Sequence, residues 1–195
     1  MSTVLAFIIS RMFYRYGMKD FMDKMDIDQK NKKLKELSER DDLTGLYNRR
    51  TIYLRLTDLI KEAEKTKKNI YLGILDLDHF KEINDRYGHL YGDEVLKTVA
   101  GKILENIREE DIAGRYGGDE FVIILYEVDY ESAGTMMKKL LQEVNELDFD
   151  TYKLSFSCGI AAWNGESSEE LFERADAYMY HVKKLGKNDI QIERT

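Results

Sequence analysis

The stretch Arg115-Tyr-Gly-Gly-Asp-Glu-Phe121 decides the fold that we expect for this chain, and an apolar run follows it to Leu125. Two adjacent glycines favour a tight turn, because a residue without a Cβ atom adopts backbone conformations that other residues avoid. The apolar run is typical of a buried strand. We therefore predict a β-hairpin whose turn carries two neighbouring carboxylates, Asp119 and Glu120.

A second acidic group stands upstream, in Asp76-Leu77-Asp78, where another apolar run ends. A carboxylate at the end of a buried strand is costly unless a cation compensates it. If the two strands are neighbours, their acids converge. Mg²⁺ takes one or two carboxylates together with waters and substrate phosphates, which is the arrangement used for nucleotidyl transfer. The alternative is two unrelated groups of surface acids, which an acidic chain supplies by abundance alone.

Composition limits the classes of function. The chain has 195 residues, 43% of them apolar, which suits one domain with an appendage. Its formal net charge of −7 argues against sequence-independent binding to long nucleic acids, which requires a basic surface. The single cysteine, Cys158, excludes an internal disulfide and is expected to lie buried in a strand. These features favour a cytoplasmic location.

The N-terminal segment, residues 1–39, is expected to be separate from a domain of residues 40–195. Its apolar run 4–9 is too short for a membrane span, which needs roughly 20 apolar residues. A signal peptide would place its charges before such a run. Residues 18–40 are expected to form either a solvated helix that packs on the domain or a short coiled-coil stalk that pairs two chains. The apolar positions of that helix are Met18, Phe21, Met22, Met25, Ile27, Leu34 and Leu37.

Hydrophobic periodicity predicts mixed helices and strands from residue 49 onward. The expected helices are 49–65, 79–86, 93–107, 130–147 and 168–185, and the expected strands are 69–78, 111–121, 121–126, 152–163 and 188–193. Asn48 is the expected N-cap of the first helix, and Gly88 and Gly92 are expected to mark a loop. Because a hairpin demands antiparallel pairing, the predicted fold class is α+β, with a central, mostly antiparallel sheet flanked by helices.

Polar residues after the first acidic strand suggest a nucleotide site. Lys81 is near enough to Asp76 to reach a phosphate as a point charge. Asn84 and Asp93 bear the groups that a guanine edge requires, since a carboxylate accepts from donors that adenine lacks. The alternative is an ordinary polar helix-loop-helix, in which such residues cap helices.

These blocks, in this order, resemble the GGDEF domain of the diguanylate cyclases, over roughly Asp41 to Ile192. The resemblance rests on the stretches 41–50, 76–93, 115–121, 157–160, 174–180 and 183–188. It implies a fold related to the polymerase palm and to nucleotidyl cyclase domains. It also implies the condensation of two GTP into cyclic di-GMP and two pyrophosphates.

The resemblance implies roles for single residues. Asp76, the carbonyl of Leu77, and Asp119 would bind Mg²⁺ or Mn²⁺, with Glu120 supporting the metal site and Asp119 serving as the base for the 3′-hydroxyl. The implied contacts to GTP are Lys81, Asn84, His89, Asp93, Gly117, Gly118, Lys183 and Lys187. Lys187 stands at a position that is often arginine in the family, so charge is kept there but bidentate phosphate binding is not.

Each such site would hold one GTP, so the product requires two sites that face each other. A two-fold homodimer is therefore expected through the catalytic faces, and the N-terminal helix is a second candidate contact. No long nucleic acid is expected as a partner, and no membrane span is expected in the chain.

Arg108-Glu-Glu-Asp111 lies where the family has its product-inhibition site. The guanidinium could bind phosphate or stack on guanine, and the carboxylate could accept from guanine.

Two rival interpretations stay open. The chain could be a catalytically inactive GGDEF domain that binds GTP or cyclic di-GMP, although such domains usually lose the residues that this chain keeps. It could also be a cyclase with altered nucleotide choice, although the carboxylate of Asp93 favours guanine.

Overall fold

A computed structural model describes residues 39–147, 149 and 152–193, together with residues 11, 14, 17–19, 21–27 and 30. Contacts divide the chain into two units, residues 1–39 and 40–195. The described residues up to position 30 are helical and exposed, whereas Leu34 and Leu37 of the expected stalk lie outside the described residues. Among the described residues, no helix is both long and apolar enough to cross a membrane.

The second unit is built on a six-stranded sheet with the strand order β1-β3-β4-β2-β5-β6. Its elements are β1 (Tyr47–Asn48), α2 (Arg49–Thr66), β2 (Ile70–Leu77), α3 (Phe80–Tyr87), α4 (His89–Asn106), β3 (Ile112–Gly117), β4 (Glu120–Tyr126), α5 (Tyr130–Asn145), β5 (Phe156–Ala162), α6 (Ser168–Leu185) and β6 (Ile190–Ile192). The central pairings, β3 with β4, β4 with β2 and β2 with β5, are antiparallel, and the two outer ones are parallel. The predicted fold class is confirmed.

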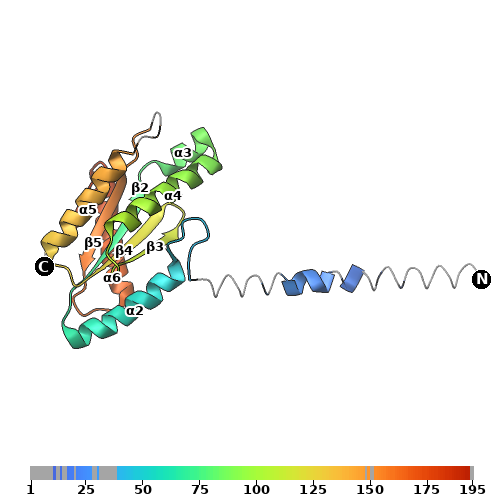
Figure 1. Ribbon diagram of the computed structural model, residues 1–195, viewed down its shortest axis with the longest axis horizontal. Helices are drawn as coiled ribbons and strands as arrows, with labels where there is room; N and C mark the ends of the chain where they lie inside the picture. Colours follow the sequence, from blue (N-terminus) through green and yellow to red (C-terminus); the bar gives the residue numbers. More distant parts are fainter. Residues whose placement is uncertain are drawn as a thin grey trace, which may run out of the picture. The chain divides into compact units, whose positions relative to one another are not determined.

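Helices cover both faces of the sheet (Figure 1). On one face, α3, α4 and α5 pack on strand residues such as Leu75 and Ile123. On the other face, α2 and α6 pack on the alternate residues, such as Ile74 and Val122. Since successive side chains of a strand point to opposite faces, a strand that is covered on both sides reads as a continuous apolar run. This explains the unbroken apolar sequences of the central strands.

Two predicted boundaries are wrong. α4 begins at His89, so Gly92 lies buried within a helix and not in a loop. A Cβ atom at position 92 would stand 2.0 Å from Asn84 Oδ1, so the glycine allows α3 to pack closely on α4. The strand expected from residue 152 begins only at Phe156, because Ser155 turns its carbonyl and its hydroxyl toward Asp78.

Local sequence fixes the turn of the hairpin and the start of α2. The turn follows Gly117, and Gly118 has a φ of +53°, which favours glycine. The predicted N-cap is confirmed, since the Asn48 side chain accepts a hydrogen bond from Thr51 N at 2.9 Å. The short strand β1 was not predicted, because two residues carry no periodic signal.

We predict that Gly159→Ala destabilises the domain by roughly 3 kcal/mol or more, which lowers Tm by about 6–12 °C. A Cβ atom at this position of β5 would stand 2.2 Å from Ala175 O and 2.2 Å from Met179 N, both in the backbone of α6. Backbone atoms cannot move aside as a flexible side chain can.

The matched control is Gly134→Ala in α5, where a Cβ atom would meet nothing within 4 Å. Alanine stabilises a helix interior over glycine by about 0.5–1 kcal/mol, so this variant should melt at the same or a higher temperature. Equal melting temperatures for the two variants would contradict the packing of α6 on β5 described here.

Candidate active site

The structure brings the two acidic groups together at one edge of the sheet. β2 and β4 are antiparallel neighbours, and their register places Asp76 opposite Glu120. Both residues continue the alternate positions that face α2 and α6. Asp119 precedes β4 in the turn, and its carbonyl accepts a hydrogen bond from Leu77 N at 3.3 Å. The expected convergence of the carboxylates thus follows from strand pairing.

Lys183 of α6 supplies a counter-charge. Its Nζ lies 2.7 Å from Asp76 Oδ2, and the side chain of Asp76 is only 14% exposed. The pKa of Asp76 is nevertheless raised, chiefly because burial disfavours its charged form; the hydrogen bond and charge of Lys183 oppose this rise, and the charges of Asp119 and Asp78 add to it. Burial also raises the pKa of Glu120, and the charges of Asp76 and Asp119 add to that rise. The site therefore has more negative charge than its single lysine balances.

The carboxylate of Asp78 is held by hydrogen bonds, whereas that of Asp76 pairs with Lys183. It is 3% exposed, and its carboxylate accepts hydrogen bonds from Ser155 Oγ and Ser157 Oγ, each at 2.7 Å, and from Asn188 N at 2.9 Å. These bonds tie the end of β2 to β5 and to the segment after α6. No pattern in the sequence indicates that Asp76 and Asp78 have these different partners.

Arg115 holds the turn that carries Asp119. Its guanidinium donates to Gly118 O at 2.9 and 2.7 Å, and it lies 3.3 Å from Asp41 Oδ1. Asp41 in turn accepts from the backbone N–H and the hydroxyl of Thr44. The stretch 41–50 is thereby connected to the signature hairpin, a link that no local sequence pattern indicates.

The expected guanine-binding residues lie on α3 and α4, which cover the opposite face of the sheet from α6. Asn84 is half-buried against Gly92, as described above. His89 and Asp93 stand one helical turn apart at the start of α4, the first exposed and the second half-buried. Lys81 is exposed on the first turn of α3. These side chains form no hydrogen bond with one another among the described residues.

The ammonium groups of Lys183 and Lys187 have different partners. Lys183 pairs with Asp76, whereas Lys187 Nζ lies 3.3 Å from Nε2 of His79, which is the N-cap of α3. His79 was not singled out from the sequence. Two cations thus reach the strand end from the C-terminal part of α6 and the residues that follow it.

Arg108 and Asp111 lie at the start of β3, away from the turn. Asp111 is buried, and its carboxylate accepts from Arg108 N at 2.9 Å and from Tyr126 N at 3.2 Å. Arg108 itself is exposed. Asp111 therefore holds the segment before β3 against the end of β4. This structural role was not predicted from the sequence.

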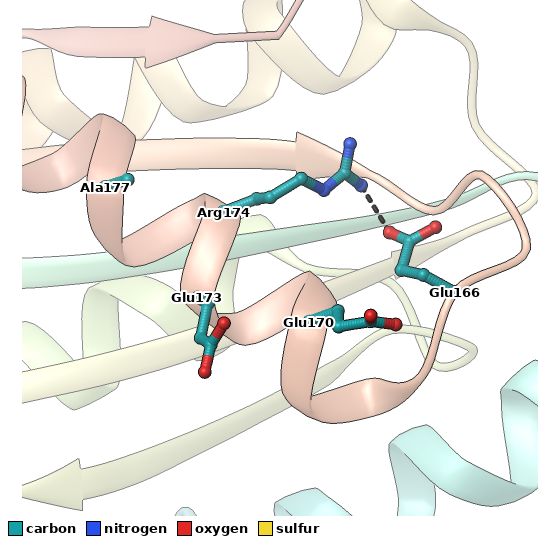
Figure 2. Close-up of a pocket in the computed structure, with 5 residues that line it drawn as sticks. All are labelled: Glu166, Glu170, Glu173, Arg174 and Ala177. Atoms are coloured by element: carbon teal, nitrogen blue, oxygen red, sulfur yellow. Dashed lines mark hydrogen bonds and ion pairs between the residues drawn. The ribbon is translucent and has the colours of Figure 1, made fainter.

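A further pocket lies on α6 and the loop before it, lined by Glu166, Glu170, Glu173, Arg174 and Ala177 (Figure 2). Arg174 points across it to Glu166 and also binds both carboxylate oxygens of Glu193, each at 2.9 Å. Because these carboxylates already hold its guanidinium, this pocket is no anion site.

The residues present fit a divalent cation only in part. Among the described residues, no three or more His, Cys, Asp or Glu side chains are grouped so that they could hold a metal ion. The strand end nevertheless offers the carboxylates of Asp76 and Asp119 and the carbonyl of Leu77, all of them hard oxygen donors. Such a set fits a cation like Mg²⁺, which takes its remaining ligands from waters and phosphates.

Comparisons with known proteins identify the family of this chain. The sequence profile described as diguanylate cyclase, GGDEF domain, matches residues 38–189. The diguanylate cyclase DgcP of Pseudomonas aeruginosa is 36% identical over 157 residues, which cover 78% of this chain and 23% of that protein. The response regulator PleD of Caulobacter vibrioides is 35% identical over 80% of this chain and 36% of its own length. The chain thus spans about a quarter to a half of the length of most curated relatives it matches.

Solved structures show the same fold. The GGDEF domain of DgcB from Caulobacter crescentus, in complex with c-di-GMP, superposes with a TM-score of 0.76 at 34% identity, covering 80% of this chain and 95% of that chain. A DgcB structure that includes the coiled coil gives 0.77 at 30% identity, covering 88% and 95%.

We predict that Glu120→Gln stabilises the metal-free protein at neutral pH by roughly 0.5 kcal/mol, or about 1–2 °C in Tm. The folded-state pKa of Glu120 is raised above 4.5, so its carboxylate costs stability once the pH exceeds that value. The gain should shrink as the pH falls toward 4.5, because wild-type Glu120, with its raised pKa, takes up a proton on the way down.

Thermal melts with a chelator across this pH range measure the effect. Glu109→Gln, at an exposed loop position, is the control and should change little. A gain for Glu120→Gln that does not vary with pH, or a loss at neutral pH, would show that the acids do not repel one another.

Proposed function

The chain belongs to the GGDEF family, and from this premise we propose that it is a diguanylate cyclase that condenses two GTP into cyclic di-GMP and two pyrophosphates. The observation that carries the proposal is the meeting of Asp76 with Asp119 and Glu120 beside Lys183 at one sheet edge. Asn84 and Asp93 lie on α3 and α4, which cover the opposite face of the same sheet. The fold of a family member that was solved with c-di-GMP supports the same assignment.

Asp76, Asp119 and the carbonyl of Leu77 would hold Mg²⁺ or Mn²⁺, with Glu120 supporting the site. A bound divalent cation would lower the pKa of the ribose 3′-hydroxyl and neutralise charge on the departing pyrophosphate. Asp119 stands in the turn, where it would accept the proton of that hydroxyl. The raised pKa of Asp76 is consistent with a site that gains stability when a divalent cation binds its carboxylates.

The cations of the site would bind the triphosphate. Lys81 on α3, with Lys183 and Lys187 at the end of α6, would surround the phosphates and stabilise the charge that builds on the leaving group. When GTP and metal are bound, the Asp76 carboxylate would exchange the Lys183 ammonium for the metal. Lys183 would then be free to turn to a phosphate.

The guanine base would lie against α3 and α4. Asn84 and Asp93 offer an amide and a carboxylate, and the carboxylate would accept from the N1–H and N2–H₂ groups of guanine. His89, at the start of α4, would contribute to the same pocket, and Gly117 and Gly118 would let the triphosphate approach the turn closely. Because adenine lacks these donors, the site would select GTP over ATP.

The reaction requires two copies of the chain, because one site holds one GTP and each GTP attacks the other. We place the reaction in the cytoplasm, where GTP is available. The N-terminal stalk belongs to this proposal because Phe21 and Met22 are apolar residues on a described helical segment. A coiled coil would cover these side chains and raise the local concentration of catalytic domains.

Product inhibition is proposed at Arg108 and Asp111. The Arg108 side chain is exposed at a distance along the sheet from the catalytic turn, so it is accessible to a second ligand. Asp111 holds the backbone of Arg108 in place through the 2.9 Å hydrogen bond to Arg108 N.

The second candidate is a catalytically inactive domain that binds GTP or cyclic di-GMP. The chain retains Asp76, Lys81, Asp119 and Glu120, and the structure gathers the carboxylates, which favours catalysis over binding alone.

We predict that the full chain, incubated with GTP, Mg²⁺ and pyrophosphatase, forms cyclic di-GMP that chromatography resolves. Asp119→Ala should lower the rate by at least ~100-fold, because it removes both a metal ligand and the base. Asp58→Ala, on the exposed surface of α2, is the matched control and should keep the rate. Binding of GTP by the wild type without any product would favour the inactive candidate.

We predict that Arg108→Ala weakens inhibition by added cyclic di-GMP by about 10-fold or more, because a charge-assisted contact is lost. The inhibited rate is compared with the uninhibited rate of the same variant, so a change in basal activity does not affect the result. Lys139→Ala, another exposed cation, should leave the inhibition constant unchanged. Undiminished inhibition of Arg108→Ala would place the inhibitory site elsewhere.

A further inference from the structure

His79 joins two parts of the chain that the proposed mechanism treats separately. Its Nδ1 lies 2.6 Å from Glu82 Oε1, one turn along α3, and its Nε2 lies 3.3 Å from Lys187 Nζ, beyond the end of α6. The three groups form a connected line from a carboxylate through an imidazole to an ammonium. The imidazole is 46% exposed, so a ligand can reach this line from solvent.

The partners determine which imidazole nitrogen carries the proton. An ionised carboxylate only accepts, so Nδ1 donates to Glu82. An ammonium only donates, so Nε2 accepts from Lys187. The hydrogen bond from His79 also lowers the pKa of Glu82, which keeps that carboxylate ionised and the tautomer fixed.

The backbone around Lys187 is already fixed, but its side chain is not. Lys187 N donates to Val182 O at 3.1 Å, and Asn188 N donates to the buried Asp78 at 2.9 Å. Lys187 itself has a φ of +66°, a conformation that these bonds hold in place. The ammonium stands at the end of a flexible stem, and it lacks the planar fork by which an arginine orients itself on a phosphate.

We propose that His79, backed by Glu82, is a positioning residue that aims the Lys187 ammonium at the terminal phosphate of GTP. The inference rests on the proposed function, since it concerns the phosphate end of that same site. His79 acts through Lys187, and the imidazole replaces the orientation that an arginine at position 187 would have supplied for itself.

Binding of inorganic pyrophosphate with Mg²⁺, measured by calorimetry on the full chain, tests this without relying on turnover. His79→Phe should weaken pyrophosphate binding roughly three- to tenfold, because Lys187 loses the acceptor that orients it. In the Lys187→Ala background the same change should have no further effect. Lys187→Arg combined with His79→Phe should restore binding, because the planar guanidinium orients itself on a phosphate without help from the imidazole.

The matched control is His181→Phe, an exposed histidine whose Nδ1 likewise lies 2.6 Å from a side-chain oxygen, that of Gln191. It should bind pyrophosphate as the wild type does. In turnover, His79→Phe should raise KM for GTP with less than about a twofold change in kcat, a split that general loss of structure would not give.

Equal losses for His79→Phe with and without Lys187 would overturn the inference, as would unchanged affinity in the single variant or no rescue by arginine. A wild-type chain that binds no pyrophosphate would also overturn it. If the pyrophosphate results hold and no cyclic di-GMP is formed, the proposed function fails while the positioning role of His79 stands.

Discussion

The antiparallel pairing of β2 with β4 is the constraint on which the site depends. It places Asp76 directly opposite Glu120 and brings the Asp119 turn to the end of β2. Burial raises the pKa values of Asp76 and Glu120, and the charges of the neighbouring carboxylates add to the rise. Such a cluster is a poor choice for stability, because partly buried like charges repel and lose hydration. It becomes favourable when cations enter, and Lys183 is the first of them.

The rest of the domain holds this charged edge in place. α6 lies so close to β5 that a Cβ atom at Gly159 would collide with its backbone, and this contact sets the helix that carries Lys183. Asp78, with the hydroxyls of Ser155 and Ser157, fixes the end of β2 from the other side. Hence packing that is remote from the carboxylates decides where the cations can reach.

The sequence predicted the strands and helices that carry strong periodicity, because periodicity is a local pattern. It placed each acidic group at a strand end for the same reason, whereas their meeting depended on whether the two strands are neighbours. It failed where a residue is explained only by a distant neighbour. Gly92 was expected in a loop because a glycine usually breaks a helix, yet it lies where α3 crosses α4. The division of labour between Asp76 and Asp78 depends on Ser155 and Ser157, almost eighty residues away. The positioning role inferred for His79 rests on its contact with Lys187, more than a hundred residues away in the chain.

The central claim is that the carboxylates of the sheet edge hold a divalent cation together with the phosphates of GTP. A crystal structure of the chain with Mg²⁺ and a non-hydrolysable GTP analogue tests it most directly. We expect a cation between Asp76 and Asp119, with the Lys183 ammonium released from Asp76 and turned to a phosphate. Nucleotide bound elsewhere, or Lys183 still paired with Asp76 and no cation at the strand ends, would contradict it.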